Sequence, residues 1–143
     1  MQGLRRRIVH AVVFEIIAVA IVTAAFAWFT DAGTGQSGAL AIATSTVAMA
    51  WNMVYNKLFE TWEARQAVRH RSPLRRAVHA IGFEGGLVVL LVPLIAWWLG
   101  ISLWTALVLD IGLMVFFLFY SYAFNWLFDH LFGLPAAVTG TRP

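Results

Sequence analysis

Four long and continuous apolar runs constrain the fold of this chain more strongly than any other feature. They occupy residues 8–29, 38–59, 77–99 and 103–128. A helix crosses a bilayer core about 30 Å thick with roughly 20 apolar residues, so each run is long enough to cross it once. The strands of a membrane β-barrel would alternate apolar and polar residues, which these runs do not do. The sequence therefore predicts an all-α integral membrane protein with four transmembrane helices.

The distribution of basic residues predicts the orientation of these helices. All ten Lys and Arg lie before the first run, around the connection between the second and third runs, or near the C-terminus. The other two connections, residues 30–37 and 100–102, contain none. The positive-inside rule then places both termini in the cytoplasm. Because topology alone explains the basic charge, we expect no nucleic-acid partner.

The composition agrees with this class and excludes some kinds of site. Hydrophobic residues make up 61% of the chain and charged residues 12%, against about 25% charged in a typical soluble domain. The chain has no cysteine, so disulfides and thiolate metal sites are excluded. Its four histidines are never three or four residues apart, which argues against a helical metal site. We expect no metal and find no cofactor motif.

The chain contains an internal repeat at a constant offset of 69 residues. The segment RIVHAVVFE at 7–15 returns as RAVHAIGFE at 76–84, and WNMVYNKLFE at 51–60 corresponds to YSYAFNWLFD at 120–129. Two separated blocks that match at one offset indicate a duplication. We predict two tandem helical hairpins, residues 1–68 and 69–143, the second ending in a short cytoplasmic tail. Both begin in the cytoplasm, so the repeat is parallel.

Two glutamates inside apolar runs are the leading candidates for function. Glu15 and Glu84 occupy equivalent positions in the repeat. An ionised carboxylate in hydrocarbon is costly, so such a group faces a cavity or partner, or binds a proton. We predict proton and substrate coupling for both, the alternative being a structural hydrogen bond to a neighbouring helix.

Polar and aromatic side chains are expected near these glutamates. Glu15 lies about seven residues, or roughly 10 Å, into its run. Asn52 lies a similar distance from the end of its own run, so we expect the two at one depth in the first hairpin. The repeat then predicts two polar sites in the cytoplasmic third of the membrane. The expected substrate-binding residues are Phe14, Trp51, Asn52, Tyr55, Asn56, Tyr120 and Asn125, with Phe83 and Phe124 beside them.

Other residues allow two interpretations each. His10 and His79 fit a proton relay or an interfacial hydrogen-bonding role equally well. Asp110 fits an exit-side cation contact or a structural group. Further candidates for relay or gating are the motifs' first residues, Arg7 and Arg76. The small-xxx-small spacing of Gly82 and Gly86 predicts close helix packing, within the chain or between chains.

The four motifs together resemble the signature motifs of the proteobacterial antimicrobial compound efflux (PACE) family, which is built from two bacterial transmembrane pair domains. The resemblance covers all four apolar runs. It implies a proton-coupled exporter of the bacterial inner membrane for cationic biocides such as chlorhexidine, and in some members acriflavine, benzalkonium or short-chain diamines. Glu15 corresponds to the family's coupling glutamate, and Glu84 to its counterpart in the second domain. Glu60 stands where an aspartate is common.

The function expected from residues and resemblance is drug/proton antiport, with cations and protons as partners in the lipid bilayer and a homodimer as the working unit. One alternative is an exporter of the small multidrug resistance type, which also has four spans and one essential glutamate. The tandem repeat and the second embedded glutamate argue against it. A non-transporting membrane scaffold would explain the glycine spacing but leaves both glutamates unexplained. An intramembrane enzyme lacks support from any nucleophile, metal set or cofactor motif.

Overall fold

The computed structural model describes residues 3–68, 70–135 and 140. Over these residues it contains four α-helices and no strand: α1 (Gly3–Phe29), α2 (Thr34–Ala64), α3 (Pro73–Leu99) and α4 (Leu103–Phe132). The helices have 27 to 31 residues, or about 40–46 Å at 1.5 Å per residue. Each is long and apolar enough to cross a membrane. The predicted four-helix membrane fold is confirmed.

The helix ends follow local sequence signals. Ser72 accepts a hydrogen bond from the backbone N–H at the third position of α3, and Pro73 begins that helix, an arrangement typical of helix N-termini. Gly100 ends α3 in the left-handed conformation, with φ of 66°, which glycine adopts without steric cost. Ser102 then caps α4 through its side-chain oxygen.

The helices are longer than the apolar runs at one end of the molecule. Within the hydrophilic stretch 60–76, residues 60–64 form the last turn of α2 and residues 73–76 the first turn of α3. In the C-terminal region, α4 continues to Phe132, beyond residue 128, where the fourth apolar run ends. Residues 136–139 and 141–143 of that tail lie outside the described residues, as do residues 1–2 and 69.

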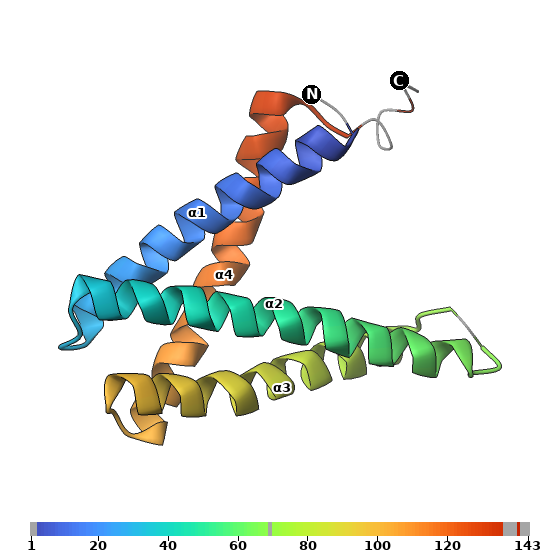
Figure 1. Ribbon diagram of the computed structural model, residues 1–143. Helices are drawn as coiled ribbons and strands as arrows, with labels where there is room; N and C mark the ends of the chain where they lie inside the picture. The colour runs from blue at the N-terminus through green and yellow to red at the C-terminus, as the bar shows by residue number, and fades with distance from the viewer. Residues whose placement is uncertain (1–2, 69, 136–139, 141–143) are drawn as a thin grey trace.

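The helices contact one another within each hairpin and between α2 and α3, and less extensively between α1 and α4. Figure 1 shows them as two pairs that separate at one end of the molecule, α1 with α4 and α2 with α3. Each pair combines one helix from each hairpin. The pairs meet near the two short turns that connect α1 to α2 and α3 to α4 (Figure 1). They diverge toward the end that holds the termini and the loop between α2 and α3. The bundle is therefore wedge-shaped, narrow at the turns and wide at the opposite end.

The buried core lies at the narrow end of this wedge. Leu40 of α2, Ile95 of α3 and Ala106 of α4 are each 0% exposed, and Phe26 of α1 is 1% exposed. Many other apolar side chains point outward and are exposed. A membrane-spanning protein places such side chains against hydrocarbon, so only a small core inside the bundle is needed to hold the helices together.

Two glycines bring α2 and α3 into close contact. A Cβ atom at Gly82 would collide with the Tyr55 hydroxyl, and a Cβ atom at Gly86 would collide with the Trp51 ring. The aromatic side chains of α2 therefore occupy the space that these glycines leave on α3. The predicted packing role of the glycine pair is confirmed, and the packing is within the chain.

Candidate functional site

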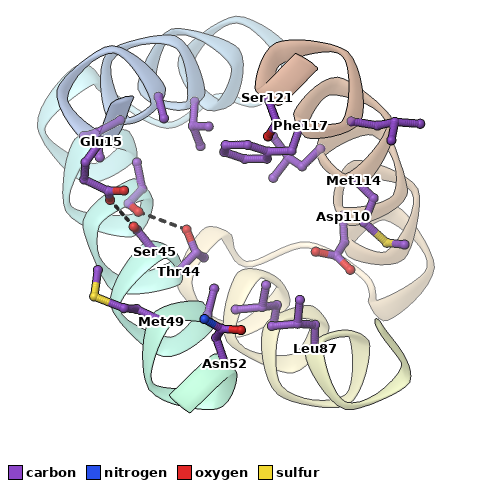
Figure 2. A pocket seen from close by; sticks show the side chains of 18 of the residues that line it. Glu15, Thr44, Ser45, Met49, Asn52, Leu87, Asp110, Met114, Phe117 and Ser121 are labelled. Carbon is purple, nitrogen blue, oxygen red and sulfur yellow. Dashed lines mark hydrogen bonds between the residues drawn. The ribbon is translucent and has the colours of Figure 1, made fainter. Parts of the chain in front are cut away.

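A cavity of about 780 Å³ lies between the four helices (Figure 2). Small-molecule sites usually have volumes of about 300–1,000 Å³. The polar residues that line it are Glu15, Thr44, Ser45, Asn52, Glu84, Asp110 and Ser121. All its other lining residues are apolar, and none of the lining side chains among the described residues is basic. The cavity is chemically suited to a cation that carries an apolar body.

The position of the cavity follows from the wedge. Its closed end consists of core residues, among them Val22, Ala41, Leu91 and Ile95. Its opposite edge includes Phe14 of α1 and Asn52 of α2, near the level where the helix pairs diverge. The cavity therefore extends from the core near the turns to the level where the helix pairs diverge.

Glu15 projects from α1 into this cavity and contacts α2. Its Oε1 accepts a hydrogen bond from the Ser45 hydroxyl (Figure 2). This corrects the expectation that Asn52 lies at the depth of Glu15, because Asn52 is about two helical turns further along α2. Asn52 still lines the cavity, and its Oδ1 accepts a hydrogen bond of 2.7 Å from Asn56 Nδ2.

Glu84 and Asp110 supply two further carboxyl groups from the other hairpin. Glu84 Oε2 and Asp110 Oδ2 are buried atoms without a hydrogen-bond partner among the described residues. Asp110 is only 3% exposed, and Figure 2 shows its carboxyl group pointing into the cavity. The two predicted sites are thus one cavity that contains both glutamates, together with an aspartate that the repeat does not duplicate.

A histidine, an asparagine and three aromatic residues form one part of the contact between α1 and α4, which we call the α1–α4 seam. His10 Nε2 lies 2.7 Å from Asn125 Oδ1, and the His10 ring packs edge-on against Phe124. The Tyr120 hydroxyl donates a 2.9 Å hydrogen bond to the Phe14 carbonyl. The polar atoms of this seam therefore form hydrogen bonds between α1 and α4.

The contact between α2 and α3, which we call the α2–α3 seam, repeats this pattern with the equivalent residues. His79 Nε2 lies 2.9 Å from Asn56 Oδ1. Trp51 Nε1 donates a 3.0 Å hydrogen bond to the Phe83 carbonyl, and the Tyr55 hydroxyl donates one of 2.9 Å to the His79 carbonyl. The repeat thus has a structural counterpart: each seam joins one hairpin to the other.

The seams separate the expected substrate-binding residues into two groups. Phe14 and Asn52 line the cavity, and Phe14 also belongs to the α1–α4 seam. The remaining five are not among the lining residues and belong to the seams: Trp51, Tyr55, Asn56, Tyr120 and Asn125. Their hydrogen bonds explain how these polar groups are accommodated in a membrane protein. A role in binding substrate stays a prediction for all seven.

Among the relay and gating candidates, the histidines lie in the seams and Asp110 lies in the cavity. Arg7 and Arg76 are exposed. The buried arginine is Arg6, which is 7% exposed, pairs with the Asp129 carboxylate and donates a 2.9 Å hydrogen bond to the Gly133 carbonyl. Sequence reasoning missed this link between the ends of α1 and α4, although Arg6 and Asp129 correspond to Arg75 and Glu60 at the offset of the repeat.

No group of three or more His, Asp or Glu side chains in the described ranges is arranged to hold a metal ion. Glu15, Glu84 and Asp110 share the cavity, but they are distributed over three helices. The polar groups of the cavity therefore suit a larger cation, one that contacts several helices at once.

Comparison with known proteins gives consistent matches over the whole helical region. The chain matches the family described as chlorhexidine efflux transporter (BTP) twice, over residues 2–65 and 71–134, and these ranges coincide with the two hairpins. It is similar to the short-chain diamines transporter of Vibrio parahaemolyticus, with 43% identity over 86% of this chain and 87% of the relative. Proteins of the same name from Acinetobacter baylyi and Acinetobacter baumannii are 37% and 35% identical, over 87% and 89% of this chain and 88% of each relative. No solved structure matches significantly.

Proposed function

The chain belongs to the chlorhexidine efflux transporter family, and we propose that it exports cationic amphipathic compounds in exchange for protons. Family membership and the four apolar helices make it a multi-pass transporter of the bacterial inner membrane. The proposal adds proton coupling, the cationic nature of the substrate, the residues that bind it, and the direction in which the cavity opens.

The observation that carries the proposal is the acidic cavity inside the membrane-spanning region. Three carboxyl groups, from Glu15, Glu84 and Asp110, line it without a basic residue among the described lining side chains. Ionised carboxylates in an apolar environment are unfavourable unless a cation or a proton accompanies them. Such a cavity therefore binds either a substrate cation or protons. Competition between the two for the same carboxylates is the chemical basis of antiport.

Glu15 is the proposed coupling residue. When deprotonated it attracts the cation, and Phe14 offers an aromatic surface at the cavity edge, to which a cation is attracted. When protonated it loses that attraction, and its carboxyl keeps the Ser45 hydroxyl as a neutral partner. Binding of a proton from the outer side would then release the substrate outward. Glu84 is proposed to assist as the equivalent group of the second hairpin.

The proposed orientation places the wide end of the wedge in the cytoplasm. The described basic residues lie at that end, in the first turns of α1, in the last turns of α2 and the loop that follows, and in the first turn of α3, as the positive-inside rule requires of a cytoplasmic side. The cavity then opens inward and is closed outward by the core near the turns. Export requires the reverse arrangement, in which the helix pairs close at the termini and separate at the turns.

The proposed substrates follow from the comparisons and the shape of the site. The family description names chlorhexidine, and the relatives are named for short-chain diamines. Acriflavine and benzalkonium are cations of similar character that serve as probes. Because the diverging pairs leave the cavity wall incomplete, we propose a homodimer as the transporting unit.

The experiment is transport by purified protein in proteoliposomes with an acidic interior. We expect wild-type vesicles to accumulate acriflavine above the level of protein-free vesicles until an ionophore collapses the gradient. Glu15→Gln removes the charge with little change in shape, and it should abolish this accumulation. The matched control is Asp31→Asn, because Asp31 is an exposed acid in the turn between α1 and α2. If wild-type protein moves none of several cations in response to the gradient, the proposal is wrong.

A further inference from the structure

Asp110 is a buried acid that the repeat does not explain. It lies on α4, is 3% exposed, and its Oδ2 has no hydrogen-bond partner among the described residues. Its carboxyl group points into the cavity, with Glu15 on the other side (Figure 2). A buried carboxyl without a partner destabilises the fold, so its presence indicates a partner that is bound only at times.

The equivalent position in the first hairpin shows that the fold does not need this acid. Ala41 stands there, is 2% exposed and belongs to the core. The pseudo-symmetric bundle therefore accommodates alanine at this depth. Asp110 makes the cavity asymmetric: one end of a ligand can meet Glu15, near α2, while the other end meets the α4 wall.

The environment of Asp110 strengthens the attraction for positive charge. Glu84 lines the same cavity and also has a buried oxygen without a hydrogen-bond partner among the described residues, and like charges in an apolar site repel one another until a cation or proton is bound. Between the acids the wall is apolar, with Val19, Leu87 and Leu113 among its residues. This arrangement matches a molecule with two positive ends and an apolar connection between them.

We propose that Asp110 is the second anchoring carboxylate of the cavity and selects compounds with two cationic ends over compounds with one. One end binds at Glu15, and the other binds at Asp110 with Glu84 beside it. This inference rests on the proposed function, since it assigns a residue and a selectivity to the same cavity. It concerns binding alone and does not depend on proton coupling.

The test is a pair of ligands that differ by one amine, 1,5-diaminopentane and 1-aminopentane, titrated calorimetrically into the purified full-length protein. Wild-type protein should bind the diamine more tightly. Asp110→Asn should weaken diamine binding by about tenfold or more, because removing one partner of a buried charge pair is costly, while monoamine binding changes by less than about twofold. Asp110→Ala introduces the residue that the first hairpin has at this position, Ala41, and should change diamine and monoamine binding in the same way as Asp110→Asn. Glu15→Gln should weaken both ligands.

The outcomes separate this inference from the proposed function. The inference is wrong if Asp110→Asn weakens the binding of both ligands equally or of neither. It is also wrong if wild-type protein binds the diamine no more tightly than the monoamine, even where transport of acriflavine is observed. If the diamine preference depends on Asp110 but vesicles show no proton-driven transport, the proposed function fails and the binding site stands. Asp110→Glu keeps the charge and should retain a preference for the diamine, which distinguishes anchoring from damage to the fold.

Discussion

Substitution of Gly86 by alanine is the most direct test of how α2 and α3 are held together. The added Cβ atom would collide with the Trp51 ring, whose Nε1 is bound to the Phe83 carbonyl at 3.0 Å. The neighbouring Gly85 lies in the same helical turn, and a Cβ atom there would meet no other atom within 4 Å. Gly85→Ala is therefore a matched control for the effect of alanine in this helix.

The expected magnitude follows from the two contacts that the substitution disturbs. Overpacking costs about 1–3 kcal/mol, and loss of the hydrogen bond costs about 0.5–1.5 kcal/mol. The general advantage of alanine over glycine in a helix, about 0.5–1 kcal/mol, applies to both variants and cancels in their comparison. Gly86→Ala should thus lower the free energy of unfolding by about 1.5–4.5 kcal/mol relative to Gly85→Ala.

The assay is equilibrium unfolding in mixed detergent micelles, followed by helical circular dichroism. Trp51→Phe in the Gly86→Ala background should be less destabilising than the sum of the single substitutions, because the smaller ring leaves room for the methyl group. Residues in contact show such coupling at about 0.5–3 kcal/mol. Equal stability of Gly86→Ala and Gly85→Ala, to within about 0.5 kcal/mol, would refute the close packing at this position.

Two further substitutions test the contacts between α1 and α4. Arg6→Ala should release the N-terminal turns of α1, because Arg6 pairs with Asp129. The change should appear as faster hydrogen exchange in these turns. The free energy of unfolding should fall by about 1–3 kcal/mol, since the carboxylate of the pair is partly exposed. Unchanged exchange would mean that the ion pair does not hold this end. Asn125→Ala removes the partner of His10 and should reduce the free energy of unfolding by about 1 kcal/mol. The same micelle assay measures it, and a stability equal to wild type would show that the pair contributes nothing.

The helices and the duplication were predictable because they depend on local pattern. Continuous apolar runs predicted the helices, and a constant offset revealed the two hairpins. The pairing of helices was not predictable in this way. The motifs that contain His10 and Asn56 read the same whether these two residues bind each other within the first hairpin or each binds a residue of the second hairpin. The structure shows the second arrangement, in which each pairs with the other hairpin.

Which residues form the candidate site also depends on how the four helices pair. Glu15 was recognisable because it interrupts an apolar run, but its contact with Ser45 depends on the angle between α1 and α2. Asp110 lacks a counterpart in the repeat, so the motifs gave no reason to place it with Glu84. Only the arrangement of all four helices brings the three acids to one cavity.

The reciprocal seams have a consequence for the origin of the chain. His10 binds Asn125 and His79 binds Asn56, which is the pattern of a two-fold symmetric interface, where residue i contacts j and j contacts i. A single ancestral hairpin would satisfy both its histidine and its asparagine by pairing with a second copy in the same orientation. Fusion made that association intramolecular. In a fused chain the two copies can also differ, and here one has an acid where the other has Ala41.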